Sequence, residues 1–235
     1  MEKYIDPVYL NANQGVLALL IFLFGLIIAF FGWIIKYLNN KPKFLIDTIE
    51  GPTFACTFKT GRIFHGYEAH ITAVVLYLNL KNVGNLPSSI EKIHIAYKWN
   101  IIPFSFNWVK YRLGWFWINN QTIALDDFQC KIGDRVKVYP FLTQLNNLAP
   151  NKVEKFIEVG KGTNGIVYFE QAESWGAMSP VVKNHKTKIK ICIVDSFGKK
   201  HRKVVNIPML ELDEALKYNP SFGMTYQTLS NEKLG

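Results

Sequence analysis

The residues best suited to chemistry in this sequence lie in the glycine-rich segment GKGTNGIV. Gly160, Gly162 and Gly165 have the spacing of the G-x-G-x-x-G loops that hold phosphate groups in dinucleotide-binding proteins and in kinases. A dinucleotide-binding loop needs a helix that begins at the loop, whereas the following residues, GIVYFE, have the composition of a strand. A kinase loop does lie between strands, but the sequence contains no H-R-D or D-F-G motif. We therefore expect a glycine-rich hairpin without a cofactor, with phosphate or nucleotide contact as the alternative.

Other catalytic and metal-binding motifs do not occur in the sequence. The five histidines lie far apart, and there is no C-x-x-C or H-E-x-x-H, so a metal site would have to assemble entirely through tertiary structure. No G-x-S-x-G motif marks a nucleophile. Asp126 and Asp127 could pair as carboxylates, but neighbours in a strand point to opposite faces. We predict neither enzymatic activity nor a metal site.

The longest element that the sequence predicts is a helix across a membrane. Residues 15–35 read GVLALLIFLFGLIIAFFGWII, and no charged side chain occurs between Asp6 and Lys36. An α-helix needs about 20 apolar residues to cross the hydrocarbon core, where only a helix or a closed barrel satisfies its own backbone. We predict a polar tail at 1–14 and a transmembrane helix at 15–38, with a core helix or a removed signal as alternatives. A cleaved signal would begin with basic residues and end at small ones, and this stretch does neither.

Two sets of residues in and beside this span indicate how it could be used. Small residues on one helical face let a second helix approach closely in lipid, although glycine and alanine are also ordinary residues of membrane helices. These helix-packing candidates are Ala18, Gly25, Ala29 and Gly32. Basic residues that flank a span tend to remain cytoplasmic, which predicts an outside N terminus and a cytoplasmic body. The flanking residues are Lys36, Lys41 and Lys43.

Beyond a short linker at residues 39–43, the apolar pattern changes from a helical to a strand-like period. Val74, Leu76, Leu78 and Leu80 alternate with residues that become more polar along the run, as in a strand half buried in a sheet. Many strands and one short soluble helix near 210–218 predict a mainly β domain over 44–230, built as a two-sheet sandwich. The expected strands include 44–50, 53–59, 71–83, 122–125, 135–143, 153–159, 166–170, 188–195 and 203–207.

One part of this pattern resembles a known structural unit. The strand at 71–83, the turn NVGNLP and a returning strand with Ile93, Ile95 and Tyr97 on one face form a hairpin-like arrangement. It resembles a unit of many prokaryotic immunoglobulin-like and CARDB-type β-sandwich domains. The resemblance implies an immunoglobulin-like β-sandwich preceded by a single N-terminal transmembrane helix, a fold that serves many functions.

The stretch 99–119 departs from the strand pattern because it mixes many aromatic residues with basic ones. Such a mixture suits the bilayer interface, where amphipathic rings sit at headgroup depth, and it also suits the energetic centre of a protein interface. Filling of the sandwich core is the third possibility. The aromatic interface candidates are Trp108, Tyr111, Arg112, Trp115 and Trp117.

Charge and cysteine content bound the possible partners and the compartment. The formal net charge is +9, and an anionic inner leaflet attracts each nearby Lys or Arg by about 1 kcal/mol. We do not expect nucleic acid as a partner, because no helix-turn-helix, zinc-finger or RNP-type motif accompanies the charge. The three cysteines form no close pair, which fits a reducing compartment, and Cys56 and Cys192 lie in apolar runs typical of buried thiols.

The sequence thus predicts a single-pass membrane protein whose β-sandwich acts as a binding or assembly module. Its expected partners are the lipid bilayer and, through the helix, either another protein or a second copy of this chain. Two alternatives remain open. One is a membrane-perturbing oligomeric effector, for example of a bacterial defence system, and the other is an outward-facing ligand-binding ectodomain.

Overall fold

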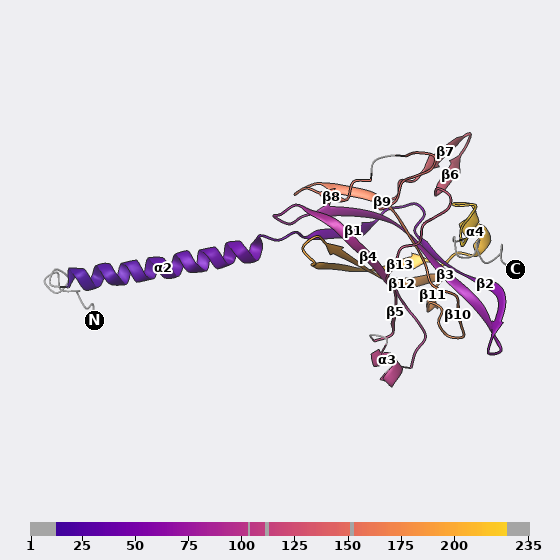
Figure 1. Ribbon diagram of the computed structural model, residues 1–235, viewed down its shortest axis with the longest axis horizontal. Helices are drawn as coiled ribbons and strands as arrows, with labels where there is room; N and C mark the ends of the chain where they lie inside the picture. The colour runs from indigo at the N-terminus through magenta and orange to yellow at the C-terminus, as the bar shows by residue number, and fades with distance from the viewer. Residues whose placement is uncertain (1–12, 103, 111–112, 151–152, 225–235) are drawn as a thin grey trace. The chain divides into compact units, whose positions relative to one another are not determined.

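The computed structural model describes residues 13–102, 104–110, 113–150 and 153–224, and the chain divides into two compact units, 1–41 and 42–235 (Figure 1). In the first unit, helix α2 (Gln14–Asn39) has 26 residues and is therefore about 39 Å long. That length exceeds the roughly 30 Å of a bilayer's hydrocarbon core.

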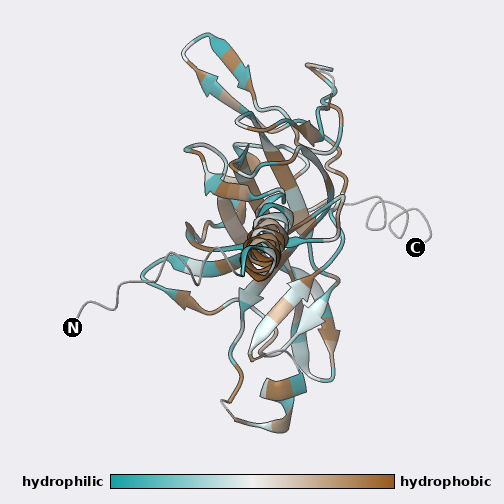
Figure 2. Cartoon of the chain, turned by 90° about the vertical axis from the view of Figure 1, so that its left-hand side faces the viewer, coloured by the Kyte–Doolittle hydropathy of each residue, from teal (hydrophilic) through white to brown (hydrophobic). Residues whose placement is uncertain are grey.

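Helix α2 confirms the predicted apolar helix. Over Gln14–Tyr37 it is long and apolar enough to cross a membrane, and it is the one such helix in the described part of the chain. None of that stretch is buried, and Figure 2 shows the helix coloured mostly as hydrophobic. A helix that is apolar all round is typical of a protein interior or of lipid, and here no protein interior covers it.

The second unit contains two main antiparallel sheets. The strands of the first are β1 (Phe44–Thr48), β2 (Phe54–Phe64), β3 (Tyr67–Asn82), β9 (Gly162–Glu170) and β10 (Ser174–Trp175). Strand β3 is central: β1 and β2 follow one another along one side of it, and β9 and β10 follow one another along the other. The predicted strand at 71–83 is therefore the organising strand of this sheet.

The second sheet is built around β4 and β12. Its strands are β4 (Ser88–Lys98), β5 (Trp115–Ile118), β8 (Phe156–Ile157), β11 (Val182–Lys183), β12 (Lys186–Asp195) and β13 (Lys200–Pro208). Strand β12 pairs with β13 on one side and with β4 and β11 on the other, and β5 extends the sheet from β4. A separate hairpin joins β6 (Gln129–Ile132) to β7 (Arg135–Val138), and the described residues of this unit also form the helices α3 (Phe106–Lys110) and α4 (Leu212–Leu216).

The two sheets enclose one hydrophobic core, which confirms a mainly β body with a sandwich-like arrangement. The residues whose alternation predicted strands are the ones that fill this core. They are Val74, Leu76, Leu78 and Leu80 from β3, Ile93, Ile95 and Tyr97 from β4, and Ile189, Ile191 and Ile193 from β12.

The prediction that β3 is half buried is wrong for its middle part, because a second core covers its other face. Val75 is fully buried and Tyr77 is partly buried there. The covering side chains come from the chain between β5 and β8 and from the C-terminal segment. They include Phe128, Tyr139, Phe141, Ala215 and Phe222. The first sheet is thus buried on both faces over part of its area.

Several local predictions differ from the structure, and the expected strands at 135–143 and 153–159 are limited to β7 (Arg135–Val138) and β8 (Phe156–Ile157). The segment 122–125 is not a strand, although the N–H of Thr122 donates to the carbonyl of Tyr168 at 3.0 Å beside β9. Strand β5 lies instead in the aromatic stretch, where residues from Trp115 to Ile118 pair with β4. Aromatic side chains are good strand formers, so the dense tryptophans that indicated an interface also fit a sheet.

Candidate functional site

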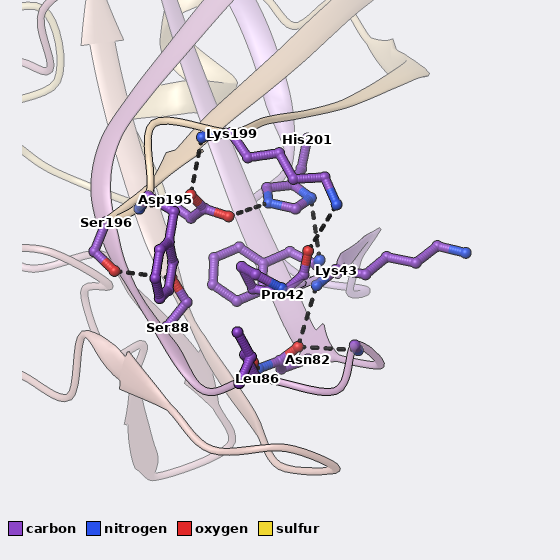
Figure 3. A network of polar contacts seen from close by, with 12 residues as sticks. Pro42, Lys43, Asn82, Leu86, Ser88, Asp195, Ser196, Lys199 and His201 are labelled. Carbon is purple, nitrogen blue, oxygen red and sulfur yellow. Dashed lines mark hydrogen bonds and ion pairs between the residues drawn. The ribbon is translucent and has the colours of Figure 1, made fainter. Parts of the chain in front are cut away.

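The chain enters the β unit through a short segment, Pro42–Phe44, that polar groups hold in place (Figure 3). The backbone N–H of Phe44 donates to Nδ1 of His201 at 3.2 Å, and Nζ of Lys199 donates to the carbonyl oxygen of Pro42 at 2.9 Å. Pro42 and Phe44 are buried while the Lys43 side chain is exposed. We call Pro42–Phe44 and its polar partners the entry network. It gives the first strand a defined start.

A buried carboxylate orients the histidine of the entry network. Oδ2 of Asp195 lies 2.8 Å from Nε2 of His201, and Oδ1 accepts the N–H groups of Phe197 and Lys199 at 2.9 Å each. Because Nδ1 of His201 accepts the N–H of Phe44, the proton of the neutral imidazole resides on Nε2 and is donated to Asp195. The sequence alone did not indicate that the Asp195 carboxylate would reach the neighbouring strand.

Asn82 completes the entry network from the opposite side. Its Oδ1 accepts the N–H groups of Lys43 at 3.4 Å and Gly84 at 3.0 Å. Its Nδ2 donates to the carbonyl oxygens of Leu86 at 2.8 Å and Ile157 at 3.2 Å. Both donors of this fully buried amide are therefore used. The asparagine joins the start of the β unit to the turn after β3 and to β8.

The glycine-rich segment serves backbone packing. Gly160 has a φ of +77°, a Cβ on Gly162 would lie 2.8 Å from the carbonyl oxygen of Leu80, and one on Gly165 would lie 2.5 Å from the nitrogen of Leu142. The turn joins β8 to β9, which pair with β4 and β3 in different sheets, so it links the sheets instead of forming the expected hairpin. The left-handed turn at Gly160 and close contacts with neighbouring backbone at Gly162 and Gly165 account for the three glycines.

The buried thiols are poorly suited to catalysis. Burial, with a smaller contribution from Glu211, raises the pKa of the Cys56 thiol to about 12, so the thiol stays protonated at neutral pH. Cys192 is also buried, and Cys130 is partly exposed. Across the residues that the structure describes, no three His, Cys, Asp or Glu side chains gather in a way that could hold a metal ion.

One half-buried acid has a pKa near neutral pH. Burial raises the pKa of Glu170 to about 7, although the hydrogen bond that Tyr168 donates to the carboxylate opposes this shift. The Tyr168 hydroxyl also accepts the N–H of Gly223 at 3.0 Å. Burial, followed by the charge of Glu170, raises the tyrosine pKa well above its usual value. The pair connects β9 to the C-terminal segment.

The predicted aromatic interface is divided between core and surface. Trp99 is buried in the inter-sheet core and Phe116 packs against that core. Between β4 and β5 the chain makes an excursion, of which residues 100–102, 104–110 and 113–114 are described; it contains α3 and stands out from the sheets in Figure 1. Its exposed apolar side chains are Ile102 (77% exposed), Phe104 (88%), Phe106 (83%), Val109 (64%) and Leu113 (51%).

Trp108 supports this excursion from within. The tryptophan is half-buried, and its ring centroid lies 5.1 Å from that of Phe104. The backbone N–H of Trp108 donates to Oγ of Ser105 at 3.1 Å. Phe104 has a φ of +61°, a conformation that costs a non-glycine residue roughly 1–2 kcal/mol. The other two candidates in this excursion, Tyr111 and Arg112, lie outside the described residues.

Trp115 and Trp117 lie on the outer face of the second sheet, because the residues between and beside them point into the core. Nζ of Lys98 lies 5.1 Å and Nζ of Lys190 lies 4.0 Å from the centre of the Trp115 ring, as in cation–π contacts. Burial, and then the positive charges of Lys98 and Arg202, lower the pKa of Lys190. This face is therefore strongly electropositive.

The electropositive face continues into a hollow with a volume of about 660 Å³ at the β11–β12 end of the sheet. No acidic side chain lines it. The lining residues are Lys98, Val181, Lys183, Asn184, Lys186, Lys188 and Asn206. An anionic group would find complementary charge here, which makes the outer face and the β4–β5 excursion the candidate interaction surface of the β unit.

The small residues of α2 are open along the helix. Nothing lies within 4 Å of a Cβ placed on Gly25 or Gly32, and Ala18 and Ala29 are exposed. The flanking Lys36, which lies in the last turn of α2, is exposed too, as are Lys41 and Lys43. Helix pairing and the direction of insertion stay predictions.

Comparison of the chain with protein-family models finds no match, and comparison with curated proteins finds none either.

Proposed function

We propose that this protein is a single-pass membrane protein whose β unit is a binding or assembly module held at the bilayer surface. The observation that carries the proposal is helix α2, with its length, its apolar composition and its exposed side chains. Only Asn40 and Lys41 separate the helix from Pro42, the first residue of the entry network. So short a linker would keep the β unit close to the membrane that the helix crosses.

We further infer that the β unit is an immunoglobulin-like module on the cytoplasmic side. The likeness of the β3–β4 unit to immunoglobulin-like and CARDB-type domains supports the first inference. Three lysines on the β side of the helix, against one on the other, support the second. The electropositive outer face would then lie near the anionic inner leaflet.

The proposed span is tested by extraction of the full-length chain from membranes. We expect carbonate at high pH to leave the protein in the membrane pellet and a nonionic detergent to release it. The matched control is Leu23→Arg/Ile27→Arg. Each arginine at the helix centre makes insertion of the helix into the bilayer less favourable by about 2.5–3.5 kcal/mol, so carbonate should release this variant. If carbonate extracts the native chain completely, the protein is not an integral membrane protein.

The assembly role is tested within the helix. The variant Gly25→Leu/Gly32→Leu fills the small-residue face, and Ile27→Phe/Ile34→Phe adds bulk on the opposite face. We expect the first variant, and not the second, to reduce crosslinked dimers in membranes. A loss of membrane potential that requires Gly25 and Gly32 would favour the effector alternative. Equal crosslinking of all three proteins would exclude self-association through this face.

A further inference from the structure

We propose that the β4–β5 excursion inserts its apolar tip into the interface of an anionic bilayer and so forms a second membrane contact. This inference rests on the proposed function, because α2 must already hold the β unit at the membrane. The occupant of the exposed surface is then the lipid leaflet itself, and not a protein partner.

The first argument is the exposure of large apolar side chains at the tip. Phe104 and Phe106 are 88% and 83% exposed, and Ile102 beside them is 77% exposed. A soluble surface exposes single apolar residues, but a contiguous group of this kind marks a contact with a protein or a membrane. The left-handed backbone of Phe104 costs conformational free energy, and burial of the ring does not offset this cost because the side chain stays exposed.

The second argument is the order of chemical types from tip to base. Beyond the exposed phenylalanines comes the half-buried Trp108, and at the base lie Trp115 and Lys98, where Nζ of the lysine donates to the carbonyl of Leu113 at 3.1 Å. This order matches the layers of a leaflet: apolar side chains suit the acyl chains, tryptophan suits the interface, and lysine suits the headgroups.

The third argument is the sign of the charge. No aspartate or glutamate occurs anywhere from Lys92 to Leu125, and none occurs from Ala177 to Val194 along β11 and β12. Lys190 and the lysine-lined hollow extend the same positive surface. Such a surface complements a continuous anionic leaflet, whose attraction for basic residues acts within a Debye length of the headgroups.

The test places a fluorophore on the tip of the full-length protein. In a Cys130→Ser background, Asn107→Cys puts the label on the exposed polar side of α3, so that the apolar side chains stay intact. Asp134→Cys is the matched control, because it is an exposed polar residue in the turn of the β6–β7 hairpin. Ile27→Cys, in the middle of α2, reports the span itself.

Each labelled protein is reconstituted into vesicles of phosphatidylcholine with phosphatidylglycerol, without any other protein. We expect the label at 107 to be quenched by lipids that carry a nitroxide near the headgroup, and to be severalfold less accessible to iodide than the label at 134. Adding Phe104→Asn/Phe106→Asn should abolish the difference between the two positions. Lys98→Gln/Lys190→Gln should reduce it in anionic vesicles, and Lys59→Gln in the first sheet should not.

The outcomes separate this inference from the proposed function. If the label at 107 is as accessible to iodide as the label at 134 while position 27 is protected, the chain spans the membrane and the excursion does not enter it. The exposed apolar tip would then belong to a protein interface. If position 27 is also accessible, the span itself is wrong.

Discussion

At the scale of single residues, Glu170 is the side chain whose pKa burial raises to near neutral pH. Its pKa is raised from 4.5 to about 7, mainly by burial. The folded state therefore holds a proton between these values that the unfolded state has released. Stability from this group is fully present below pH 4.5 and is lost as the pH rises to about 7, by up to about 3 kcal/mol.

The variant Glu170→Gln isolates this effect. The amide cannot ionise and still accepts the Tyr168 hydroxyl, so we expect the decline in the free energy of unfolding between these pH values to become much smaller. Urea unfolding of the detergent-solubilised chain at several pH values measures it. Glu158→Gln is the control, because this exposed acid only pairs with Lys161 on the surface. An unchanged pH profile in Glu170→Gln would contradict the assignment.

Asn82 shows how much one buried amide can organise. In Asn82→Asp the carboxylate would face the carbonyl oxygens of Leu86 and Ile157, to which the amide now donates. We expect a loss of about 3 kcal/mol in the free energy of unfolding, because two acceptors lose their donor and a charge is buried. Thermal unfolding in detergent, with the exposed Asn119→Asp as the comparison, measures this loss. Equal midpoints for the two variants would show that the amide donors do not stabilise the turn.

At the scale of elements, the link from β8 to β9 distinguishes a packing role for glycine from a ligand-binding role. A Cβ at position 165 would meet the backbone of Phe141 and Leu142 at 2.5–2.7 Å, whereas nothing lies within 4 Å of one at position 160. We expect Gly165→Ala to destabilise the protein by roughly 3 kcal/mol, and Gly160→Asn, which tolerates the left-handed turn, by less than about 1 kcal/mol. Chemical denaturation compares the two. A stable Gly165→Ala protein would refute the close-contact explanation.

The elements that could be predicted from the sequence are those whose side chains repeat with a regular period. The apolar residues of α2 and the alternating runs around Leu76, Ile95 and Ile191 have such periods, and each forms the expected element. The second core could not be predicted in the same way. It gathers Val75 and Phe128 into one cluster, and the segments that cover the sheet there have no period of their own and fold over it only through long-range packing.

The candidate surface was predictable only in part, for a related reason. The mixture of aromatic and basic residues in 99–119 indicated an interface, but composition alone could not separate Trp99, which is buried, from Phe104, which is exposed. Composition could not separate Phe116 from Trp115 and Trp117 either, because only the pairing of β5 with β4 turns alternate side chains inward. The entry network was missed because only the completed fold brings His201 to Phe44 and Asn82 to Lys43.

At the scale of the whole molecule, the three thiols report which side of the membrane the β unit occupies. Cys56 and Cys192 are buried and Cys130 is partly exposed, so a maleimide should label the native protein at Cys130 first. With a membrane-impermeant reagent we expect no label in intact cells and strong label in opened cells, and Cys130→Ser should remove it. Labelling of Cys130 in intact cells would instead place the β unit outside, as in the ectodomain alternative.

The pairing of β4 with β12, in which Ile95 lies opposite Ile191, has a consequence for synthesis of the protein on the ribosome. If α2 is the proposed membrane span, it emerges and can reach the membrane before β12 has been translated. Until β12 is made, the inward-facing apolar residues of β3 and β4 stay exposed in the nascent chain. A chain that stops before β12 would display unpaired strand edges, so translation of β12 decides between a folded β unit and a substrate for chaperones and proteases.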